Sequence, residues 1–360
     1  MKKILSLLLI AAMVLALVAC GAPAQVPEET AAPTEAATEV PTEAPTEEPT
    51  EEPTEEPTEA EPVIRSPMKM ELPQAEITDP AEKTEVPADA SRTSMNGDIL
   101  APNAMKSAAD PIDPYRPWYD VGTAKQMEGD VYTLLLFLDD YESSWTAQEI
   151  ESFIWNKYYP AETWLCQQAA GWGATLNLSC GYYATDSVNT LRYNGYVGDF
   201  SGSVNNDIME QVAASLGFVD KETMHWQMQE WVGTDNITYV VVVDKPGRSY
   251  AMMDWYNDGY EYMEYAMLFA QPLYVGNLVY DCPPSTVAHE MLHTFGAEDF
   301  YAEGDARNGR AALAEYYYPY GIMYQTYYDI NYNYVDQFTA YAVGWTDYTP
   351  DVCYSSDWWN

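Results

Sequence analysis

The sequence predicts an α/β domain with a mostly parallel, twisted sheet over residues 113–360. Residues 130–138 and 237–243 are nearly continuous apolar runs rich in Val, Leu and Tyr, which is typical of strands buried on both faces. Helical patterns lie between the predicted strands, and strands that alternate with helices favour parallel pairing. The stretch is long enough to bury one sizeable hydrophobic core.

Caps and helix breakers place the remaining elements. Thr146 and Glu149 form a capping-box pattern that opens a helix through Ile154. Gly171 is expected to end the next helix, and residues 245–248, with Pro then Gly at their centre, predict a tight turn. In chain order, we expect further helices over 160–170, 206–216, 221–231, 310–316 and 336–343, the last of them capped by Asp336. Shorter strands are expected over 175–178, 249–253 and 264–269.

Residues 288–299 contain the pattern His-Glu-x-x-His-x-x-Gly-x-x-Asp. His289 and His293 are four residues apart and would lie on one face of a helix, at the spacing that lets two imidazoles bind one metal ion. Glu290, the next residue round the helix, can hydrogen-bond a metal-bound water without being a ligand itself. The pattern predicts a catalytic metal site on a helix.

The sequence also predicts where this helix begins and ends. Residues 283–286, Pro-Pro-Ser-Thr, offer a proline entry and a hydroxyl N-cap. Gly296 stands where a helix can end in the left-handed conformation, which glycine adopts at little cost. The chain is therefore expected to turn back at Gly296, and the carboxylates of Glu298 and Asp299 follow directly.

The pattern resembles the long zinc-binding motif of the metzincin clan of peptidases, in which the third ligand lies six residues after the second histidine. Asp299 stands at that position; most metzincins have His there, and Asp resembles the snapalysin variant. Residues 320–324, Tyr-Gly-Ile-Met-Tyr, resemble the methionine turn of the clan, with Met323 as an apolar floor beneath the metal. The resemblance extends from about residue 239 to about residue 345.

The resemblance implies a metzincin-like zinc peptidase domain with an active-site helix, a methionine turn and a C-terminal helix. It implies Zn²⁺ bound by His289, His293 and Asp299, with one position left open for water. It also implies that Glu290 is the general base in the hydrolysis of protein or peptide substrates. The sequence departs from astacin-like and serralysin-like members at Gln325, where they have a tyrosine.

Two alternatives stay open. Glu315 lies 22 residues after His293 on a short predicted helix, and it resembles the glutamate ligand of gluzincin-type peptidases. A catalytically inactive surface binding protein would share the zinc shell without turnover. The third histidine, His225, lies among polar residues at helical spacing, so we expect a surface or capping role for it.

Residues 1–20 have the features of a lipoprotein signal peptide. Two lysines precede an apolar run too short for a transmembrane helix, and residues 17–20 resemble the lipidation box of bacterial lipoproteins. Cys20 is therefore expected to carry a lipid anchor in the membrane, on the extracytoplasmic side of the cell surface. Residues 21–112 are rich in Pro, Thr and Glu, a composition that favours a disordered stalk rather than a domain.

Charge and cysteine content restrict the partners and the covalent links. Residues 111–360 hold 35 acidic against 9 basic side chains, which makes nucleic acid a poor partner, and we expect a monomer. Of the four cysteines after Cys20, Cys166 and Cys180 are the favoured disulfide pair, with free thiols as the alternative. Residues 329–333 match part of a calcium loop but lack its glycine and closing glutamate, so we expect a solvated turn there.

Overall fold

The computed structural model describes residues 65–73, 90–93, 115–116, 120, 122–185, 191–198, 208–252, 263–301 and 308–358. The chain divides into two compact units, Met1–Glu59 and Ala60–Asn360. The first unit lies outside the described residues, and with it the predicted signal peptide, Cys20 and most of the Pro/Thr/Glu repeats. Among the described residues, no helix has the length and apolar character needed to cross a membrane.

A six-stranded, mostly parallel sheet forms the centre of the second unit, in the order β1-β3-β2-β4-β6-β5. The four inner strands pair in parallel, and the two edge strands pair antiparallel to them. The α/β class with a mostly parallel sheet is therefore confirmed. The strands are β1 (Met68–Lys69), β2 (Gly129–Phe137), β3 (Leu176–Tyr183), β4 (Ile237–Pro246), β5 (Tyr250–Met252) and β6 (Tyr265–Gln271).

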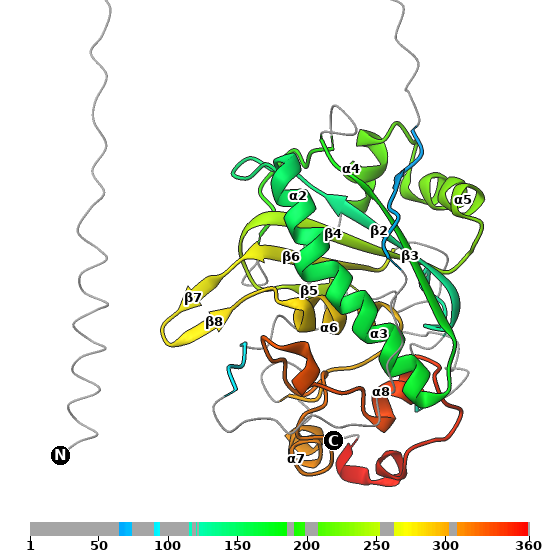
Figure 1. Ribbon diagram of the computed structural model, residues 1–360, viewed down its shortest axis with the longest axis vertical. Helices are drawn as coiled ribbons and strands as arrows, with labels where there is room; N and C mark the ends of the chain where they lie inside the picture. Colours follow the sequence, from blue (N-terminus) through cyan, green and yellow to red (C-terminus); the bar gives the residue numbers. More distant parts are fainter. Residues whose placement is uncertain are drawn as a thin grey trace, which may run out of the picture. The chain divides into compact units, whose positions relative to one another are not determined.

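Helices cover both faces of this sheet (Figure 1). Along β2, Leu135 and Phe137 belong to one buried cluster, and the alternate residues Leu134 and Leu136 belong to another, as the two-residue period of a strand requires. The first cluster includes side chains of α2 (Ala147–Phe153), α3 (Tyr159–Trp172) and α6 (Pro284–Thr294). The second includes side chains of α4 (Ile208–Ser215) and α5 (Lys221–Val232).

The helix after β2 is longer than the sequence predicts. Helix α2 begins at the expected capping box of Thr146 and continues through a π-helical turn, Ile154–Tyr158, directly into α3. Pro160, which lacks an N–H, comes just after that π turn, where the regular bonding pattern is already interrupted. The expected stop at Gly171 is wrong: α3 continues to Trp172, and its C-cap is Gly173, whose φ of 83° is left-handed.

One further expectation fails beyond β4, and one pair of strands there was not predicted. The predicted tight turn at 245–248 is not formed as such, because β4 continues to Pro246 with a register shift after Val243. A short antiparallel hairpin, β7 (Leu273–Val275) and β8 (Leu278–Tyr280), follows β6 and was not predicted. Its strands are only three residues long, which is too short for an alternation of apolar and polar side chains to be recognised in the sequence.

The segment after α6 is built from short elements. Asp336 is the N-cap of α8, where its carboxylate accepts from the N–H groups of Phe338 and Thr339, as predicted. Asp329 caps a single 3₁₀ turn, in which its side chain accepts from the N–H of Asn331. The elements are α7 (Asn308–Tyr317), α8 (Gln337–Ala342) and the 3₁₀ turns Ile330–Tyr332, Asp351–Tyr354 and Ser356–Trp358.

Parts of the range that we expect to be a stalk lie on the domain. Strand β1 extends the sheet by pairing Met68 and Lys69 with Tyr182 and Gly181 of β3. Residues 90–93 form a second contact, described below, against residues 326–328. Both segments are too short to show a periodic pattern, and only the partner strand determines that they are extended.

Cys166, Cys180, Cys282 and Cys353 are all free thiols in the structure. The favoured Cys166–Cys180 disulfide is therefore wrong, and the free-thiol alternative holds. Three of the four are buried, and burial raises the pKa of Cys180 and of Cys282 to about 12. These thiols behave as small apolar core side chains rather than as nucleophiles.

Candidate metal centre

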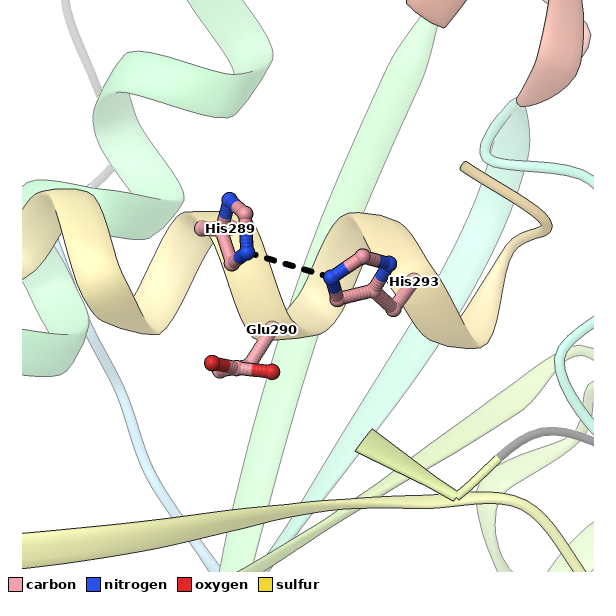
Figure 2. Close-up of side chains that lie close together, drawn as sticks. All are labelled: His289, Glu290 and His293. Carbon is pink, nitrogen blue, oxygen red and sulfur yellow. Dashed lines mark hydrogen bonds between the residues drawn. The ribbon is translucent and has the colours of Figure 1, made fainter. Parts of the chain in front are cut away.

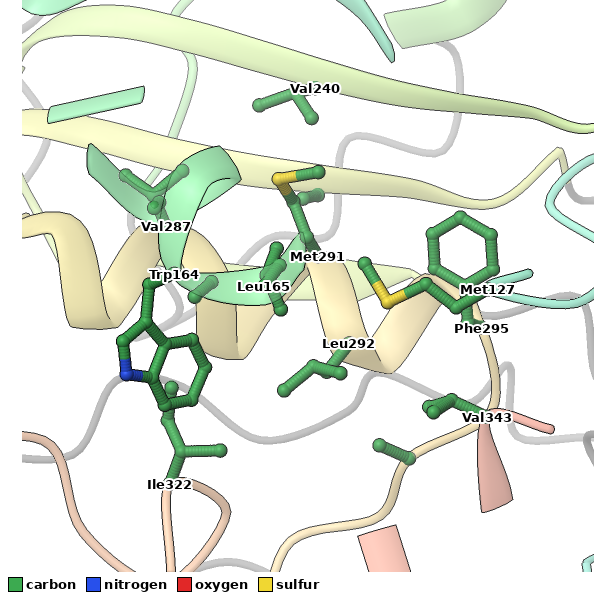
Figure 3. Packing of buried hydrophobic residues seen from close by; sticks show 14 of the residues in the cluster. Met127, Trp164, Leu165, Val240, Val287, Met291, Leu292, Phe295, Ile322 and Val343 are labelled. Atoms are coloured by element: carbon green, nitrogen blue, oxygen red, sulfur yellow. The ribbon is translucent and has the colours of Figure 1, made fainter. Parts of the chain in front are cut away.

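Helix α6 lies inside the protein rather than on its surface. Every residue from Ser285 to Thr294 is buried, and its apolar side chains fill the space between β4 and the long helix α3. In the view of Figure 3, Met291 lies below Val240 and Leu292 below Met291, and all three belong to one buried cluster with Leu165. Burial of each such side chain stabilises the fold by roughly 1.5–3 kcal/mol, so α6 is held rigidly.

The N-terminus of α6 differs from the expected cap. Pro283 is the N-cap residue, and its side chain has no atom that could accept a hydrogen bond from the first turn, which Pro284 opens. The hydroxyl of Ser285 donates to the carbonyl of Tyr327 (2.5 Å), and that of Thr286 donates to the carbonyl of Asp281 (3.2 Å). The predicted hydroxyl cap is wrong because both groups tie the helix to neighbouring segments instead.

The C-terminus of α6 forms the predicted reversal. Gly296 has a φ of 99°, in the left-handed region that glycine adopts without strain. Its N–H donates to the carbonyl of His293 (2.9 Å), and the next N–H, of Ala297, donates to the carbonyl of Leu292 (3.1 Å). This pair of bonds is the Schellman motif. It directs the chain back toward the side of α6 on which His293 lies.

Three ionisable side chains of α6 lie in this apolar interior. His289, Glu290 and His293 are all 0 % exposed, and one ligand atom from each lies within 4.8 Å of the others. Figure 2 shows one nitrogen of each imidazole facing the other ring, with the Glu290 carboxylate beside them, and the two ring planes lie at 86°. Burying such groups costs several kcal/mol unless they are paired or bind a cation. This buried group can hold a metal ion.

The hydrogen bonds of the two histidines assign their tautomers. His289 Nδ1 faces the carbonyl of Ile322 (3.0 Å), and His293 Nδ1 faces the carbonyl of Ala297 (2.8 Å). A carbonyl only accepts, so each Nδ1 carries a proton and each neutral ring leaves the lone pair of Nε2 free. The two Nε2 atoms are 3.1 Å apart. Two lone pairs at that distance repel unless a proton or a metal cation lies between them.

Asp299 brings a third acceptor to the same point. Its Oδ1 lies 3.3 Å from His289 Nε2 and 3.2 Å from His293 Nε2, while its Oδ2 accepts a hydrogen bond from the hydroxyl of Tyr301 (3.0 Å). Ligands about 2.0–2.1 Å from a tetrahedral metal are separated from one another by about 3.3–3.4 Å. The three atoms are therefore spaced nearly as three corners of a tetrahedral metal site.

Either carboxylate, Glu290 or Asp299, lies near enough to the imidazoles to be considered as the third ligand. A carboxylate oxygen of Glu290 lies within 4.8 Å of the ligand atoms of both histidines. Oδ1 of Asp299 is closer, at 3.3 Å from His289 Nε2 and 3.2 Å from His293 Nε2. Glu290 is also about 100° round the helix from His289, so its side chain leaves α6 in a different direction. The shorter separations favour Asp299 over Glu290 as the third ligand of a metal ion at this group.

The charges of the three groups are coupled. Burial lowers the pKa of His289. Burial also lowers the pKa of His293, but the Asp299 carboxylate more than offsets this and raises it to about 9. Burial raises the pKa of Asp299, and the two imidazoles move it well below its usual range. The centre therefore favours one positive charge beside Asp299, and a bound metal ion would displace the proton from His293.

The loop that carries Asp299 is fixed from both sides. Glu298 forms a buried ion pair with Arg310 of α7, and the N–H of Phe300 donates to the carbonyl of Met323 (3.0 Å). Arg310 is 1 % exposed. The sequence did not single out Arg310 or Tyr301, because an arginine or a tyrosine near a carboxylate carries no motif of its own.

The segment that resembles a methionine turn lies against α6. Met323 is 0 % exposed and belongs to the same core cluster as Met291 and Leu292. The N–H groups of Tyr324 and Gln325 both donate to the carbonyl of Gly321 (3.0 Å each), which closes the turn. Together with the bond from His289 to Ile322, this turn determines the orientation of one imidazole, as an outer shell around a metal does.

Glu315, the alternative third ligand, and His225, the third histidine, both lie outside the candidate metal centre. Glu315 is exposed on α7, and it is not among the residues whose ligand atoms converge. His225 is 0 % exposed, so the expected surface role is wrong. Its Nδ1 donates to the hydroxyl of Tyr239 (2.8 Å), and Gln229 donates to its Nε2 (3.0 Å). Burial, together with Lys125, lowers the pKa of His225 to about 4.

A separate pocket of about 600 Å³ lies where β2 and β3 end. It shares no lining residue with α6, so it does not coincide with the candidate metal centre. It is lined by Asp139, Thr185, Arg192, Asn194, Gln211, Ala214 and Ser215. Among the residues that the structure describes, the group on α6 is the one in which His, Cys, Asp or Glu side chains meet at a spacing that could hold a metal ion.

No protein-family model matches the chain, and no curated protein matches its sequence at a significant level. The class that the fold and site define is therefore a mixed α/β protein with a buried His-Glu-His group able to hold a metal ion.

Proposed function

We propose that this protein is a zinc-dependent endopeptidase with a metzincin-like domain. The observation that carries the proposal is the convergence of His289 Nε2, His293 Nε2 and Asp299 Oδ1 at 3.1–3.3 Å, with the Glu290 carboxylate buried beside them. Three protein ligands of this type leave one coordination position open, as in catalytic rather than structural zinc sites.

Each side chain has a role in hydrolysis. The two histidines and Asp299 would hold the metal, and Zn²⁺, when bound, supplies a Lewis acid for the scissile carbonyl and lowers the pKa of water toward about 7. Glu290 accepts a proton from the attacking water and returns it to the leaving amine. Glu290 is 0 % exposed. Bulk water therefore does not compete with the attacking water for hydrogen bonds to its carboxylate.

The donor set alone does not select zinc. Two histidines and one carboxylate also bind Fe(II) in oxygenases. Glu290 favours hydrolysis, because a carboxylate next to the metal that is not a ligand is what a water-activating site needs. The substrates are proteins or peptides, and the acidic domain favours basic segments among them.

The location proposed for this activity rests on the sequence. Lipidation at Cys20 and the Pro/Thr/Glu-rich stalk would hold the domain at the extracytoplasmic face of the cell membrane. A lipid anchor leaves the whole domain in the aqueous phase, where it can reach polypeptides near the cell surface.

The alternative from another class is a binding protein that keeps the metal shell without turnover. Hydrolysis of a denatured, generic protein by the purified full chain distinguishes the two. We expect hydrolysis that a chelator abolishes, and Glu290→Gln should retain zinc while turnover falls by a factor of about 100 or more. Glu315→Gln, an exposed position on α7, is the matched control and should retain both. Zinc without hydrolysis in the wild type would support the binding protein instead.

A further inference from the structure

Residues 91–93 pair with residues 326–328, which follow the turn that orients His289. The two segments form an antiparallel bridge between Arg92 and Tyr327. The N–H of Thr93 donates to the carbonyl of Thr326 (3.2 Å), and the N–H of Tyr328 donates to the carbonyl of Ser91 (3.3 Å). An extended segment from a distant part of the chain thus occupies a backbone edge beside the metal centre.

The backbone edge of residues 326–328, called here the docking strip, is held in one orientation. The N–H of Tyr327 donates to Asn333 Oδ1 (3.1 Å), and its carbonyl accepts from Ser285 Oγ of α6 (2.5 Å). Because backbone groups of successive residues in an extended chain face opposite sides, the N–H of Tyr328 and the carbonyl of Thr326 face outward. These two groups are the ones that residues 91–93 bind.

The docking strip borders the candidate metal centre. Ser285, which fixes the strip, lies four residues before His289 on the same face of α6, which is about 6 Å along the helix axis. The carbonyl of Ile322 that binds His289 Nδ1 belongs to the preceding turn of the same segment. A peptide that adds to this strip would therefore extend along the side of the centre.

The side chain at the middle of the bound segment is basic. The Arg92 guanidinium lies over the ring of Tyr327, 5.2 Å from its centroid, in the arrangement of a cation–π contact. The Tyr327 ring is 0 % exposed and its hydroxyl accepts from Gln325 Nε2 (2.9 Å), so the ring presents one fixed face. Residues 111–360 hold 35 acidic against 9 basic side chains, and this negative charge also attracts a cationic side chain to the Tyr327 ring.

The contact of residues 91–93 consists of few interactions, although Thr93 is buried in it, at 5 % exposed. Its two hydrogen bonds, at 3.2 and 3.3 Å, are at or just beyond the long end of the usual range, and Ser91 and Arg92 are exposed. We propose that the docking strip binds an extended peptide with a basic side chain over Tyr327, and that residues 91–93 of the same chain occupy it in competition with such a peptide. As a statement about substrate, this rests on the proposed peptidase function; as a statement about binding, it does not.

The test measures binding of a labelled peptide with the sequence of residues 90–94, Ala-Ser-Arg-Thr-Ser, to the full chain. Thr93→Pro removes the N–H that donates to Thr326, and Thr93→Ala is the matched control, because it loses the same side chain and keeps the N–H. We expect the peptide to bind about fivefold more tightly to Thr93→Pro than to Thr93→Ala, the ratio that corresponds to one backbone hydrogen bond of about 1 kcal/mol.

Two further comparisons keep the test decisive. Arg92→Ala should shift peptide affinity in the same direction as Thr93→Pro, and it remains informative if the proline variant does not fold. A peptide with Glu in place of Arg should bind more weakly to every variant. Equal affinity across wild type, Thr93→Pro and Arg92→Ala would overturn the proposal, whether or not the chain hydrolyses peptides. Loss of hydrolysis with the affinity differences intact would count against the peptidase function alone.

Discussion

The buried ion pair between Glu298 and Arg310 gives a sharp prediction for the loop that carries Asp299. Arg310→Met retains the aliphatic bulk beside Phe338, over whose ring the guanidinium lies at 5.6 Å, but it removes the charge that faces Glu298. Both residues are nearly inaccessible to solvent: Glu298 is 5 % exposed and Arg310 is 1 % exposed. Breaking a buried pair from one side costs about 3–5 kcal/mol, because the remaining charge loses its partner.

The assay is thermal unfolding of the metal-free protein, followed by zinc titration. For a domain of this size, 1 kcal/mol corresponds to about 2–4 °C in Tm, so Arg310→Met should lower Tm by about 6–20 °C. Its zinc affinity should fall about 10–100-fold, as when an outer-shell partner is lost. The double variant Arg310→Met, Glu298→Met replaces the pair by apolar side chains and should recover most of the Tm. A single variant that unfolds at the wild-type temperature, or a double variant no more stable than the single one, would refute the reasoning.

Two further predictions concern acid stability and location. The pKa of His225 is lowered from 6.5 to about 4 in the folded protein. Between these pH values the unfolded chain binds a proton at His225 and the folded chain does not. The contribution of neutral His225 to the free energy of unfolding is therefore complete above pH 6.5, and about 3 kcal/mol of it is lost as the pH falls to 4. His225→Gln should flatten that part of a urea-unfolding profile against pH, and an unchanged slope would contradict the assignment. Cys20→Ala should release the protein from the membrane fraction, because the apolar run is too short to anchor alone; retention with an uncleaved leader would contradict the lipoprotein interpretation.

The elements that could be predicted from the sequence are those specified by neighbouring residues. The runs that became β2 and β4 are long and apolar, the capping box at Thr146 and the cap at Asp336 are local hydrogen bonds, and the reversal at Gly296 depends on one residue type. Local signals failed where a distant contact decides. Gly171 stays helical because the continuous rod packs on the sheet, where burial outweighs a cost of about 1 kcal/mol for an internal glycine.

The candidate site shows the same division. The spacing of His289 and His293 follows from helix geometry, and the position of Asp299 follows from the turn at Gly296. The groups that orient them come from elsewhere in the chain: the carbonyl of Ile322 and the ion pair at Arg310. The polar residues around His225 predict a surface position for it. In the fold, Tyr239 on β4 is a buried hydrogen-bond partner of His225, which no local pattern could indicate.

The identity of the third ligand tests the central claim most directly. The measurement is zinc stoichiometry, by elemental analysis, of wild type, Asp299→Ala and Glu315→Ala purified without chelator. We predict about one zinc per chain in the wild type and in Glu315→Ala, whose side chain is exposed on α7, and loss of stoichiometric zinc in Asp299→Ala, because only two protein ligands remain. Zinc retained by Asp299→Ala and lost from Glu315→Ala would contradict the site, and no stoichiometric zinc in the wild type would contradict the metal centre itself.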